Sequence, residues 1–467
     1  MKGYLAVDIG ASSGRHIMAW LEGGLLKLEE VYRFPNGAEM KNGHLCWDMD
    51  ALYAHVVAGM HAAKEKGFAP IAMGIDTWAV DFVLLDESDR PVGDLVAYRD
   101  SRTQGMDKAL EKTYPFEQLY ARTGIAKQPF NTVYQMMAVL REHPEYRETV
   151  RDFLMVPEYL AFRLTGRKMH EWTNASTTAL CDARTKQWSP EVIHAAGLPA
   201  HWFAGKIHQP GAVVGSLLRE IREAVGFDTD VILTATHDTG SAYLAVPARD
   251  DQAAFLSSGT WSLLGTELDA ACATQESRAA GFTNEGGYGG TTRYLKNIMG
   301  LWMLQCIRKE LDDAYTFAEM ADMAAASDYD AYVDAADNRF LAPANMLDEV
   351  KAALREAGAP APRNLADVLR TVNLSLAMCY RDAIDGMSRL TGKQFTSVNI
   401  VGGGSQNQLL NSLTAQMTGL SVYAGPTEGT AIGNLIVQMI AKGEFTSLQE
   451  ARDTVKKSFD IKEVSHS

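Results

Sequence analysis

One order of strand and turn patterns occurs twice along the 467-residue chain. Near the N-terminus an apolar run, GYLAVDIG, is followed by a turn of small polar residues and a second strand-like run, SGRHIMAWLE. Shortly after Pro247 the same order returns in AAFLSSGTWSLLGTEL. Internal similarity on this scale favours two domains of one ancestry around a shared cleft. We therefore expect an α/β fold with domains at residues 1–247 and 248–467.

Further elements follow from hydrophobic periodicity. A helix is predicted from Asp48 to Lys66, and the apolar run IAMGI after it is typical of a buried strand that ends at Asp76. In the second half, a long helical stretch over residues 364–387 leads to the strand SVNIV, a glycine loop and another helix. Residues 100–225 are expected to be mostly helical, with breaks at prolines.

Composition argues against several classes of protein. The net charge is −14 and no basic run resembles a nucleic-acid footprint. No apolar stretch reaches the roughly 18 residues of a membrane helix, and the first residues do not form a signal peptide. The five cysteines include no CxxC pair, and the histidines form no zinc-ligand set. We expect a cytoplasmic protein with reduced cysteines, no nucleic-acid or membrane partner, and a monomeric or weakly homodimeric state.

The first small-residue turn has the chemistry of a phosphate loop. Backbone N–H groups and hydroxyls in such a turn can face an anion, and a neighbouring carboxylate can hold Mg²⁺. The candidates are Asp8 for the metal and Ala11, Ser12, Ser13, Gly14 and Arg15 for phosphate oxygens. Glycine-containing hairpins are mostly only turns, so this motif alone is weak. A second such turn, at residues 257–261, strengthens the interpretation. No GxxxxGK[ST] loop is present.

Two other segments have residues suited to a sugar and to proton transfer. Residues 74–81 present Asp76, Trp78 and Asp81, and sugars are bound by carboxylates that read hydroxyls and by aromatic faces. Trp78 in the core with Asp81 capping a turn remains an alternative. Asp238 lies between a strand and a helix, where it could take a proton from an attacking hydroxyl; a helix N-cap is its alternative role.

Two glycine-rich loops lie in the C-terminal half. The loop at residues 402–405 follows a strand, and backbone without side chains there would let an adenine or its ribose approach. A simple strand-to-helix turn explains this loop equally well. The stretch 425–434 is interpreted as a close-packed turn rather than as part of the chemistry.

Taken together, these motifs resemble the FGGY carbohydrate kinase family over about residues 4–440. The resemblance is carried by DIGASSGR, GIDTWAVDFVLLD, VAYRDSRT, THDTGSA, LSSGTWSLLG, TNEGG, LKNIMGLWMLQ and IVGGGSQNQLLN. It implies two actin-like (ribonuclease H-like) domains of duplicated topology around a central cleft, as in the ATPase core of actin, hexokinase and chaperones.

The resemblance also implies a reaction and the residues that perform it. The reaction is Mg²⁺-dependent transfer of the ATP γ-phosphate to the C1 hydroxyl of L-rhamnulose, a step of rhamnose catabolism. Asp238 is carried over as proton acceptor, between the substrate-binding residues His237 and Thr239. The segment from Ala11 to Arg15 and the residues Thr260, Gln305 and Gly403 match nucleotide contacts. Asn297 matches a sugar contact, beside Asp76, Trp78 and Ala79. Ala79 stands where a glycine is expected, and its methyl group could narrow the sugar pocket.

Three alternatives remain open. Another kinase of the family would act on L-fuculose, on a xylulose such as L-xylulose, or on glycerol. An ATP-driven module of the actin type would bind a protein partner and would not need the segment 76–81. A dinucleotide oxidoreductase is disfavoured because residues 10–14 lie in a hairpin pattern and not in a βαβ unit.

Overall fold

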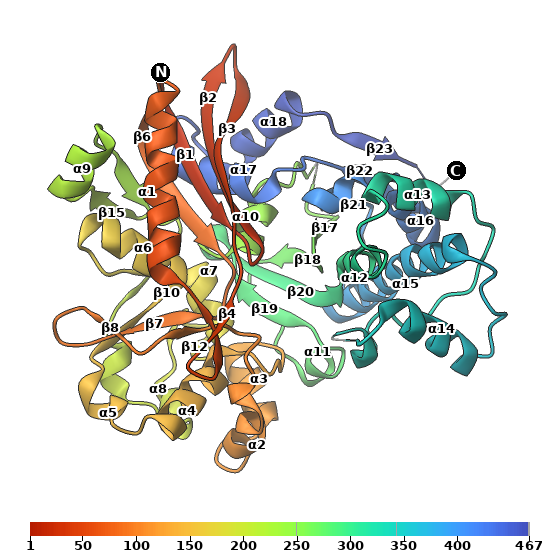
Figure 1. The fold of residues 1–467 in the computed structure, drawn as a ribbon, viewed down its shortest axis with the longest axis horizontal. Helices are drawn as coiled ribbons and strands as arrows, with labels where there is room; N and C mark the ends of the chain where they lie inside the picture. The colour runs from red at the N-terminus through yellow and green to blue at the C-terminus, as the bar shows by residue number, and fades with distance from the viewer. Residues whose placement is uncertain (249, 342, 466–467) are drawn as a thin grey trace. The chain divides into compact units, whose positions relative to one another are not determined.

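The computed structural model describes residues 1–248, 250–341 and 343–465, which divide into two compact units (Figure 1). The first unit contains residues 1–245, 267–294 and 430–458, and the second contains residues 246–266, 295–429 and the chain from 459 onward. The expected boundary at 247/248 lies near the first crossing between units. Two later stretches, residues 267–294 and 430–458, pack with the first unit, so the compact units are not continuous in sequence. The boundary at 247/248 therefore stays a prediction.

The first unit is built on a six-stranded sheet with the order β15-β16-β6-β1-β2-β3. At its centre, β1 pairs antiparallel with β2 and parallel with β6. Seven of the eight residues of β1 are buried, which is why its sequence is almost continuously apolar. The strands are β1 (Lys2–Ile9), β2 (Ser13–Glu22), β3 (Leu25–Pro35), β6 (Ala69–Thr77), β15 (Val213–Ser216) and β16 (Asp230–Ile232).

The sheet of the second unit repeats this topology. Here β17 pairs antiparallel with β18 and parallel with β21, β21 pairs parallel with β22, and β22 pairs antiparallel with β23. These relations match those of β1, β2, β6, β16 and β15 in the first sheet. The predicted duplication of topology is therefore confirmed. The strands are β17 (Ala253–Ser258), β18 (Trp261–Leu268), β20 (Thr292–Met299), β21 (Ser397–Val401), β22 (Ser421–Ala424) and β23 (Lys462–Val464).

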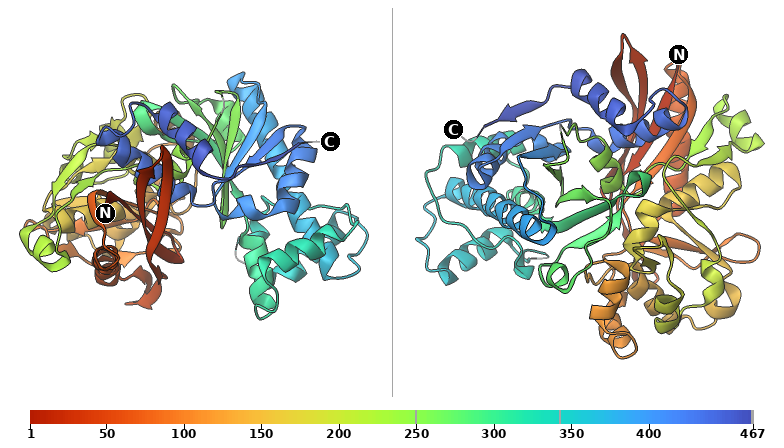
Figure 2. Two further views of the ribbon diagram at one scale, coloured as in Figure 1. Left: turned by 90° about the horizontal axis from the view of Figure 1, so that it is seen from above. Right: turned by 180° about the vertical axis from the view of Figure 1, so that it is seen from behind.

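Helices cover these sheets much as periodicity predicts. In the first unit α1 packs on β2 and β3, and Asp48 caps its N-terminus by accepting a hydrogen bond from Ala51 N at 2.9 Å (Figure 1). In the second unit α15 contacts α12, α13, α14 and α16, so it is buried on several sides (Figure 2, blue and teal). The helices are α1 (Met49–Glu65), α12 (Trp302–Glu310), α13 (Phe317–Ala325), α14 (Met346–Glu356), α15 (Leu365–Thr391) and α16 (Gln408–Thr418).

The expectation that residues 100–225 are mostly helical is wrong in part. This region contains the helices α2 (Met106–Glu111), α3 (Phe116–Thr123), α4 (Thr132–Glu142), α6 (Val156–Thr165) and α9 (Arg219–Val225). Between them lie short strands, of which β10 (Asp152–Met155) pairs with β7 (Phe82–Leu85). Short apolar runs fit either a helix or a strand, and pairing with a distant strand decides between them.

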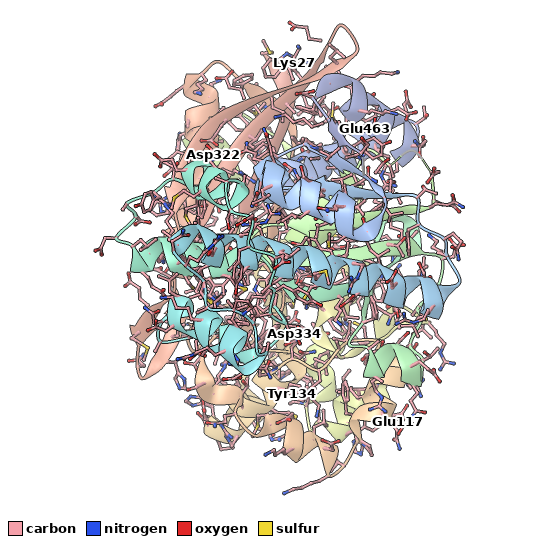
Figure 3. The ribbon with its side chains drawn as sticks, turned by 90° about the vertical axis from the view of Figure 1, so that its right-hand side faces the viewer. Lys27, Glu117, Tyr134, Asp322, Asp334 and Glu463 are labelled. Atoms are coloured by element: carbon pink, nitrogen blue, oxygen red, sulfur yellow. The ribbon has the colours of Figure 1, made fainter. Side chains whose placement is uncertain are left out.

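Other expectations concern the surface and the cysteines. In the described chain no helix is long and apolar enough to cross a membrane. None of the five cysteines forms a disulfide; Cys46 and Cys181 are buried and the other three are partly exposed. Asp328, Asp330 and Asp334 are exposed to solvent, and Asp334, labelled in Figure 3, lies on the segment between α13 and α14.

Candidate active site

Asp238 is the first residue of α10 (Asp238–Leu244), just beyond the end of β6. Thr77 at the end of β6 forms an isolated parallel bridge with His237, and its N–H donates to Thr236 O at 2.9 Å. His237 occupies the N-cap position, without a side-chain capping bond. The alternative role of Asp238 as a helix N-cap is therefore wrong.

The Asp238 carboxylate has the surroundings of a general base. Its Oδ1 accepts hydrogen bonds from Thr239 N at 2.5 Å and from Thr239 Oγ1 at 3.1 Å. Desolvation raises its pKa against the lowering effect of His237, and Asp8 raises it further. A carboxylate whose pKa is raised toward the operating pH is better matched to accepting a hydroxyl proton. About a third of its side-chain surface, 33%, stays exposed and therefore reachable.

Buried charged residues behind His237 were not identified from the sequence. Arg293 Nη2 lies 3.1 Å from His237 Nδ1 and 3.1 Å from Glu285 Oε2. On the other side of the ring, His237 Nε2 lies 3.3 Å from Asp238 Oδ1. Glu285 lies in the TNEGG motif, which carries part of the resemblance to the family but predicts no role for this residue. Charged residues within a short run of small and apolar residues were the sequence signal that could have identified Glu285 and Arg293.

Glu171 supports the same segment and was also missed. It is fully buried and accepts hydrogen bonds from Thr236 N at 3.0 Å and Thr236 Oγ1 at 2.7 Å. It also binds Thr173 N and Thr173 Oγ1, both at 2.6 Å. A carboxylate that satisfies this many donors holds the backbone immediately before His237 in place.

Asp8 and Asp76 lie opposite each other on the adjacent parallel strands β1 and β6. Asp8 Oδ2 accepts from Arg15 Nε at 3.1 Å and Nη2 at 2.9 Å. Asp76 is fully buried; its Oδ2 accepts from Asn434 Nδ2 at 2.5 Å, whereas its Oδ1 has no hydrogen-bond partner among the described residues. Desolvation, followed by the charge of Asp8, raises the pKa of Asp76 well above its ordinary value. Asn434, in a stretch interpreted as a simple turn, thus reaches a candidate residue.

The phosphate-type turn between β1 and β2 is held by backbone bonds and by Asn36. Gly10 N donates to Ser13 O at 2.9 Å, and Asn36 donates to Ser12 O at 3.0 Å and to Gly10 O at 2.8 Å. A Cβ on Gly14 would lie 2.1 Å from the Phe34 ring, so packing requires glycine there. Ser12 is exposed, and Ala11, Ser13 and Arg15 are partly exposed. The turn is therefore accessible to an anion.

The segment predicted to bind the sugar is tightly packed. Asp81 Oδ2 accepts from Trp47 Nε1 at 2.7 Å and from Trp78 Nε1 at 2.9 Å, and the two indole rings are 4.2 Å apart. Val80 has φ 69°, a strained conformation for a β-branched residue, which Thr132 stabilises by donating to Val80 O at 2.7 Å. Trp78 is thus packed as a core residue would be. Its contact with a sugar, and that of the partly exposed Ala79, stay predictions.

The predicted nucleotide residues of the second unit gather around the ends of β17 and β21. Thr260 Oγ1 lies 3.4 Å from the side-chain amide of Gln305 in α12. A Cβ on Gly404, next to Gly403, would lie 1.9 Å from Ser258 Oγ, so this loop rests directly on the end of β17. Asn297, the predicted sugar contact on β20, has a buried Oδ1 without a hydrogen-bond partner among the described residues.

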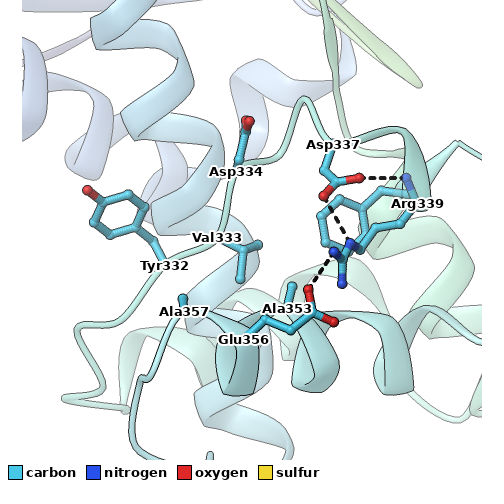
Figure 4. Close-up of a pocket in the computed structure, with 9 residues that line it drawn as sticks. Tyr332, Val333, Asp334, Asp337, Arg339, Ala353, Glu356 and Ala357 are labelled. Carbon is cyan, nitrogen blue, oxygen red and sulfur yellow. Dashed lines mark hydrogen bonds and ion pairs between the residues drawn. The ribbon is translucent and has the colours of Figure 1, made fainter.

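A pocket of about 390 Å³ lies elsewhere in the second unit (Figure 4). Its lining includes Asp334, Asp337 and Glu356, and Arg339 pairs with Asp337 at 3.0 Å and with Glu356 at 2.7 Å. None of the residues predicted for the active site lines it. An excess of carboxylates disfavours phosphate there, so we assign it no part in the site.

Comparison with known proteins decides the family. Residues 3–245 match the N-terminal domain of the FGGY family of carbohydrate kinases, and residues 254–442 match its C-terminal domain. The chain belongs to the FGGY family. A rhamnulokinase of Oceanobacillus iheyensis is 46% identical over 98% of this chain and 97% of its own length. The rhamnulokinase of Bacillus subtilis is 39% identical over 98% and 94%.

Solved structures agree with this FGGY fold. Gluconate kinase from Lactobacillus acidophilus has a TM-score of 0.83 at 17% identity, covering 100% of this chain and 94% of its own. Plasmodium falciparum glycerol kinase with ADP has a TM-score of 0.78 at 14% identity, covering 99% and 94%. The protein is therefore a carbohydrate kinase of this fold, and membership in the FGGY family implies ATP as its phosphoryl donor.

Proposed function

We propose that the protein transfers the γ-phosphate of ATP to the C1 hydroxyl of L-rhamnulose, giving L-rhamnulose 1-phosphate and ADP. The observation that carries this chemistry is the reachable Asp238 carboxylate, which its neighbours hold by one oxygen. The full-length relatives named rhamnulokinase support the choice of sugar.

In the proposed reaction the chain's own residues take part in bond making and breaking only through proton transfer to Asp238. Asp238 Oδ2 accepts the proton of the C1 hydroxyl while the hydroxyl oxygen bonds to the γ-phosphorus. The bond from that phosphorus to the β,γ-bridging oxygen breaks, and ADP leaves. Phosphoryl transfer depends mainly on positioning and on charge stabilisation, so one base and a well-held sugar suffice. His237, Thr239 and Asn297 would contact the sugar, with Asp76, Trp78 and Ala79 around it.

The remaining predicted residues would bind the nucleotide and Mg²⁺. The turn from Ala11 to Arg15 would hold phosphate oxygens, and Thr260, Gln305 and Gly403 would contact the nucleotide. Mg²⁺ is bound by one or two carboxylates together with phosphates and water, and when bound it neutralises phosphate charge. The described residues contain no cluster of three or more metal-ligating side chains. Asp8 fits the smaller requirement of one carboxylate: its charge raises the pKa of the neighbouring Asp76, an effect that a bound cation would offset.

A coupled ADP-release assay tests the substrate. We expect kcat/KM to be highest with L-rhamnulose and lower with L-fuculose, L-xylulose and glycerol, and the sugar product to carry phosphate at C1. A preference for another ketose would show that L-rhamnulose is not the preferred substrate, but it would leave the proposed kinase chemistry intact. A sugar pocket narrowed by the Ala79 methyl group would explain such a preference. ATP hydrolysis that no sugar accelerates would overturn both.

A further inference from the structure

His237 lies between a cationic and an anionic group in the interior of the first unit. Its Nε2 is 3.3 Å from Asp238 Oδ1, and its Nδ1 is 3.1 Å from Arg293 Nη2. Arg293 is 1% exposed and His237 is 7% exposed. Contacts this deeply enclosed are screened little by water, so they decide where the imidazole carries its proton.

The chemistry of arginine settles which ring nitrogen is protonated. A guanidinium stays charged and can only donate hydrogen bonds. Nδ1 of His237 must therefore accept from Arg293, which leaves the single proton of the neutral ring on Nε2. That nitrogen lies 3.3 Å from Asp238 Oδ1, within ion-pair distance. Arginine thus places the ring N–H on the side of the carboxylate.

The two oxygens of Asp238 consequently differ. Oδ1 accepts hydrogen bonds from Thr239 N at 2.5 Å and from Thr239 Oγ1 at 3.1 Å, and His237 Nε2 lies 3.3 Å from it. In the described part of the chain Oδ2 accepts no hydrogen bond. The two hydrogen bonds and the nearby imidazole on Oδ1 hold the carboxylate and leave Oδ2 as the oxygen with lone pairs for a substrate proton.

Glu285 acts on Arg293 more than on the histidine. Its Oε2 lies 3.1 Å from Arg293 Nη2 and 3.4 Å from His237 Nδ1, and that oxygen accepts no hydrogen bond within the described chain. Burial raises the pKa of Glu285, but Arg293 and His237 lower it by more, so it stays ionised. Arg293 Nε also donates to Gly286 O at 2.8 Å, which fixes the guanidinium plane. The buried cation is therefore compensated and held in orientation.

We propose that Arg293 is a positioning residue that acts through His237: it makes Nδ1 an acceptor, so that Nε2–H holds Asp238 Oδ1 and Oδ2 faces the sugar hydroxyl. The inference rests on the proposed role of Asp238. Without Arg293, His237 can carry its proton on Nδ1 and donate to Glu285. The Nε2 lone pair then faces Oδ1, repels it, and turns the carboxylate away from its working orientation.

The first test reads the ring proton in the unmodified enzyme. NMR of protein with ¹⁵N-labelled histidine, with His237 assigned by the loss of its signals in His237→Gln, distinguishes protonated from unprotonated ring nitrogens. We expect a proton on Nε2 of His237 and none on Nδ1. A proton on Nδ1 overturns the proposal without any variant having to fold.

The second test is a double-mutant cycle. Arg293→Gln should lower kcat at least roughly tenfold, as expected when a base loses its orientation, and Arg293→Lys should restore part of it by donating to Nδ1. In His237→Gln the amide can donate to Oδ1 without depending on a tautomer. There Arg293→Gln should cost less than about threefold, because the two residues act as one unit. Equal losses in both backgrounds would overturn the proposal.

A matched control separates positioning from packing. Arg452→Gln removes another buried, ion-paired arginine of the first unit, which bonds to Glu267 and to the backbone of Tyr243. It should lower the melting temperature without changing kcat more than about twofold. If Asp238→Asn stays active, the proposed function fails together with this inference. If Asp238→Asn is inactive while Arg293→Gln keeps its kcat, only the role of Arg293 is wrong.

Discussion

The turn between β1 and β2 and the turn between β17 and β18 occupy equivalent places in their sheets, yet they differ in charge. Both close by a backbone bond from a glycine: Gly10 N donates to Ser13 O and Gly259 N donates to Trp261 O, each at 2.9 Å. The first turn adjoins the ion pair of Asp8 and Arg15. Beside the second, Thr260 lies against the uncharged Gln305.

The two turns therefore share a backbone arrangement but are suited to different roles. Among the predicted site residues the carboxylates lie in the first unit, where Asp8 raises the pKa of both Asp76 and Asp238. The second unit offers neutral donors and exposed glycine backbone, which suit recognition of a nucleotide rather than proton or metal chemistry. Substitutions of Asp8 and Asp238 should therefore change kcat, whereas a substitution of Gln305 should change the KM for ATP.

The largest expected effect is that of Asp238→Asn. Loss of the proposed base should lower kcat by several orders of magnitude, because the amide cannot accept the hydroxyl proton. ADP release with L-rhamnulose measures the rate, and ATP titration followed by intrinsic fluorescence should show unchanged nucleotide binding. A rate above roughly a tenth of wild type in a clean preparation would show that the base lies elsewhere.

Asp8→Asn should have the next largest effect. Removing the carboxylate proposed for Mg²⁺ should lower kcat about 10²-fold, the size found for one electrostatic group at a reacting centre, and raise the Mg²⁺ concentration needed for half-maximal rate. Asp50→Asn, an exposed first-unit carboxylate paired with Arg163, is the control. An unchanged Mg²⁺ dependence in Asp8→Asn contradicts the metal assignment.

In the second unit, Gln305→Ala should raise the KM for ATP roughly tenfold and leave the KM for the ketose unchanged. Loss of one hydrogen bond costs about 0.5–1.5 kcal/mol, and about 1.4 kcal/mol corresponds to a factor of ten. Steady-state kinetics with each substrate varied in turn measure both constants. Lys351→Ala, on the exposed face of α14, should change neither. A loss confined to kcat would place Gln305 in the chemistry and weaken the contrast between the units.

Local sequence patterns predicted the elements around the two turns. A central strand, a glycine turn and an amphipathic helix each have a recognisable pattern within a short window of sequence. The strand β1, the helix α15 and the HDT segment at the start of α10 were found in that way. The partners behind the site left no such trace. Arg293 is 56 residues from His237, and Asn434 is 358 residues from Asp76. Only folding brings such pairs together, and no pattern within a short window encodes them.

The smallest expected effect is on stability, in Asp76→Asn. The pKa of Asp76 is raised on folding, mainly by burial, so the native protein binds its proton more tightly than the unfolded chain does. Wild-type stability is therefore lost as pH rises from the ordinary carboxyl range through the raised native pKa. An amide carries no charge and can still accept from Asn434, so the variant should gain about 1–2 kcal/mol at pH 8 and less at pH 4. Urea unfolding at both pH values measures the difference. A variant that is less stable at pH 8 would mean that the Asp76 charge is compensated by a cation or donor in solution, which would bring Asp76 into the metal site with Asp8.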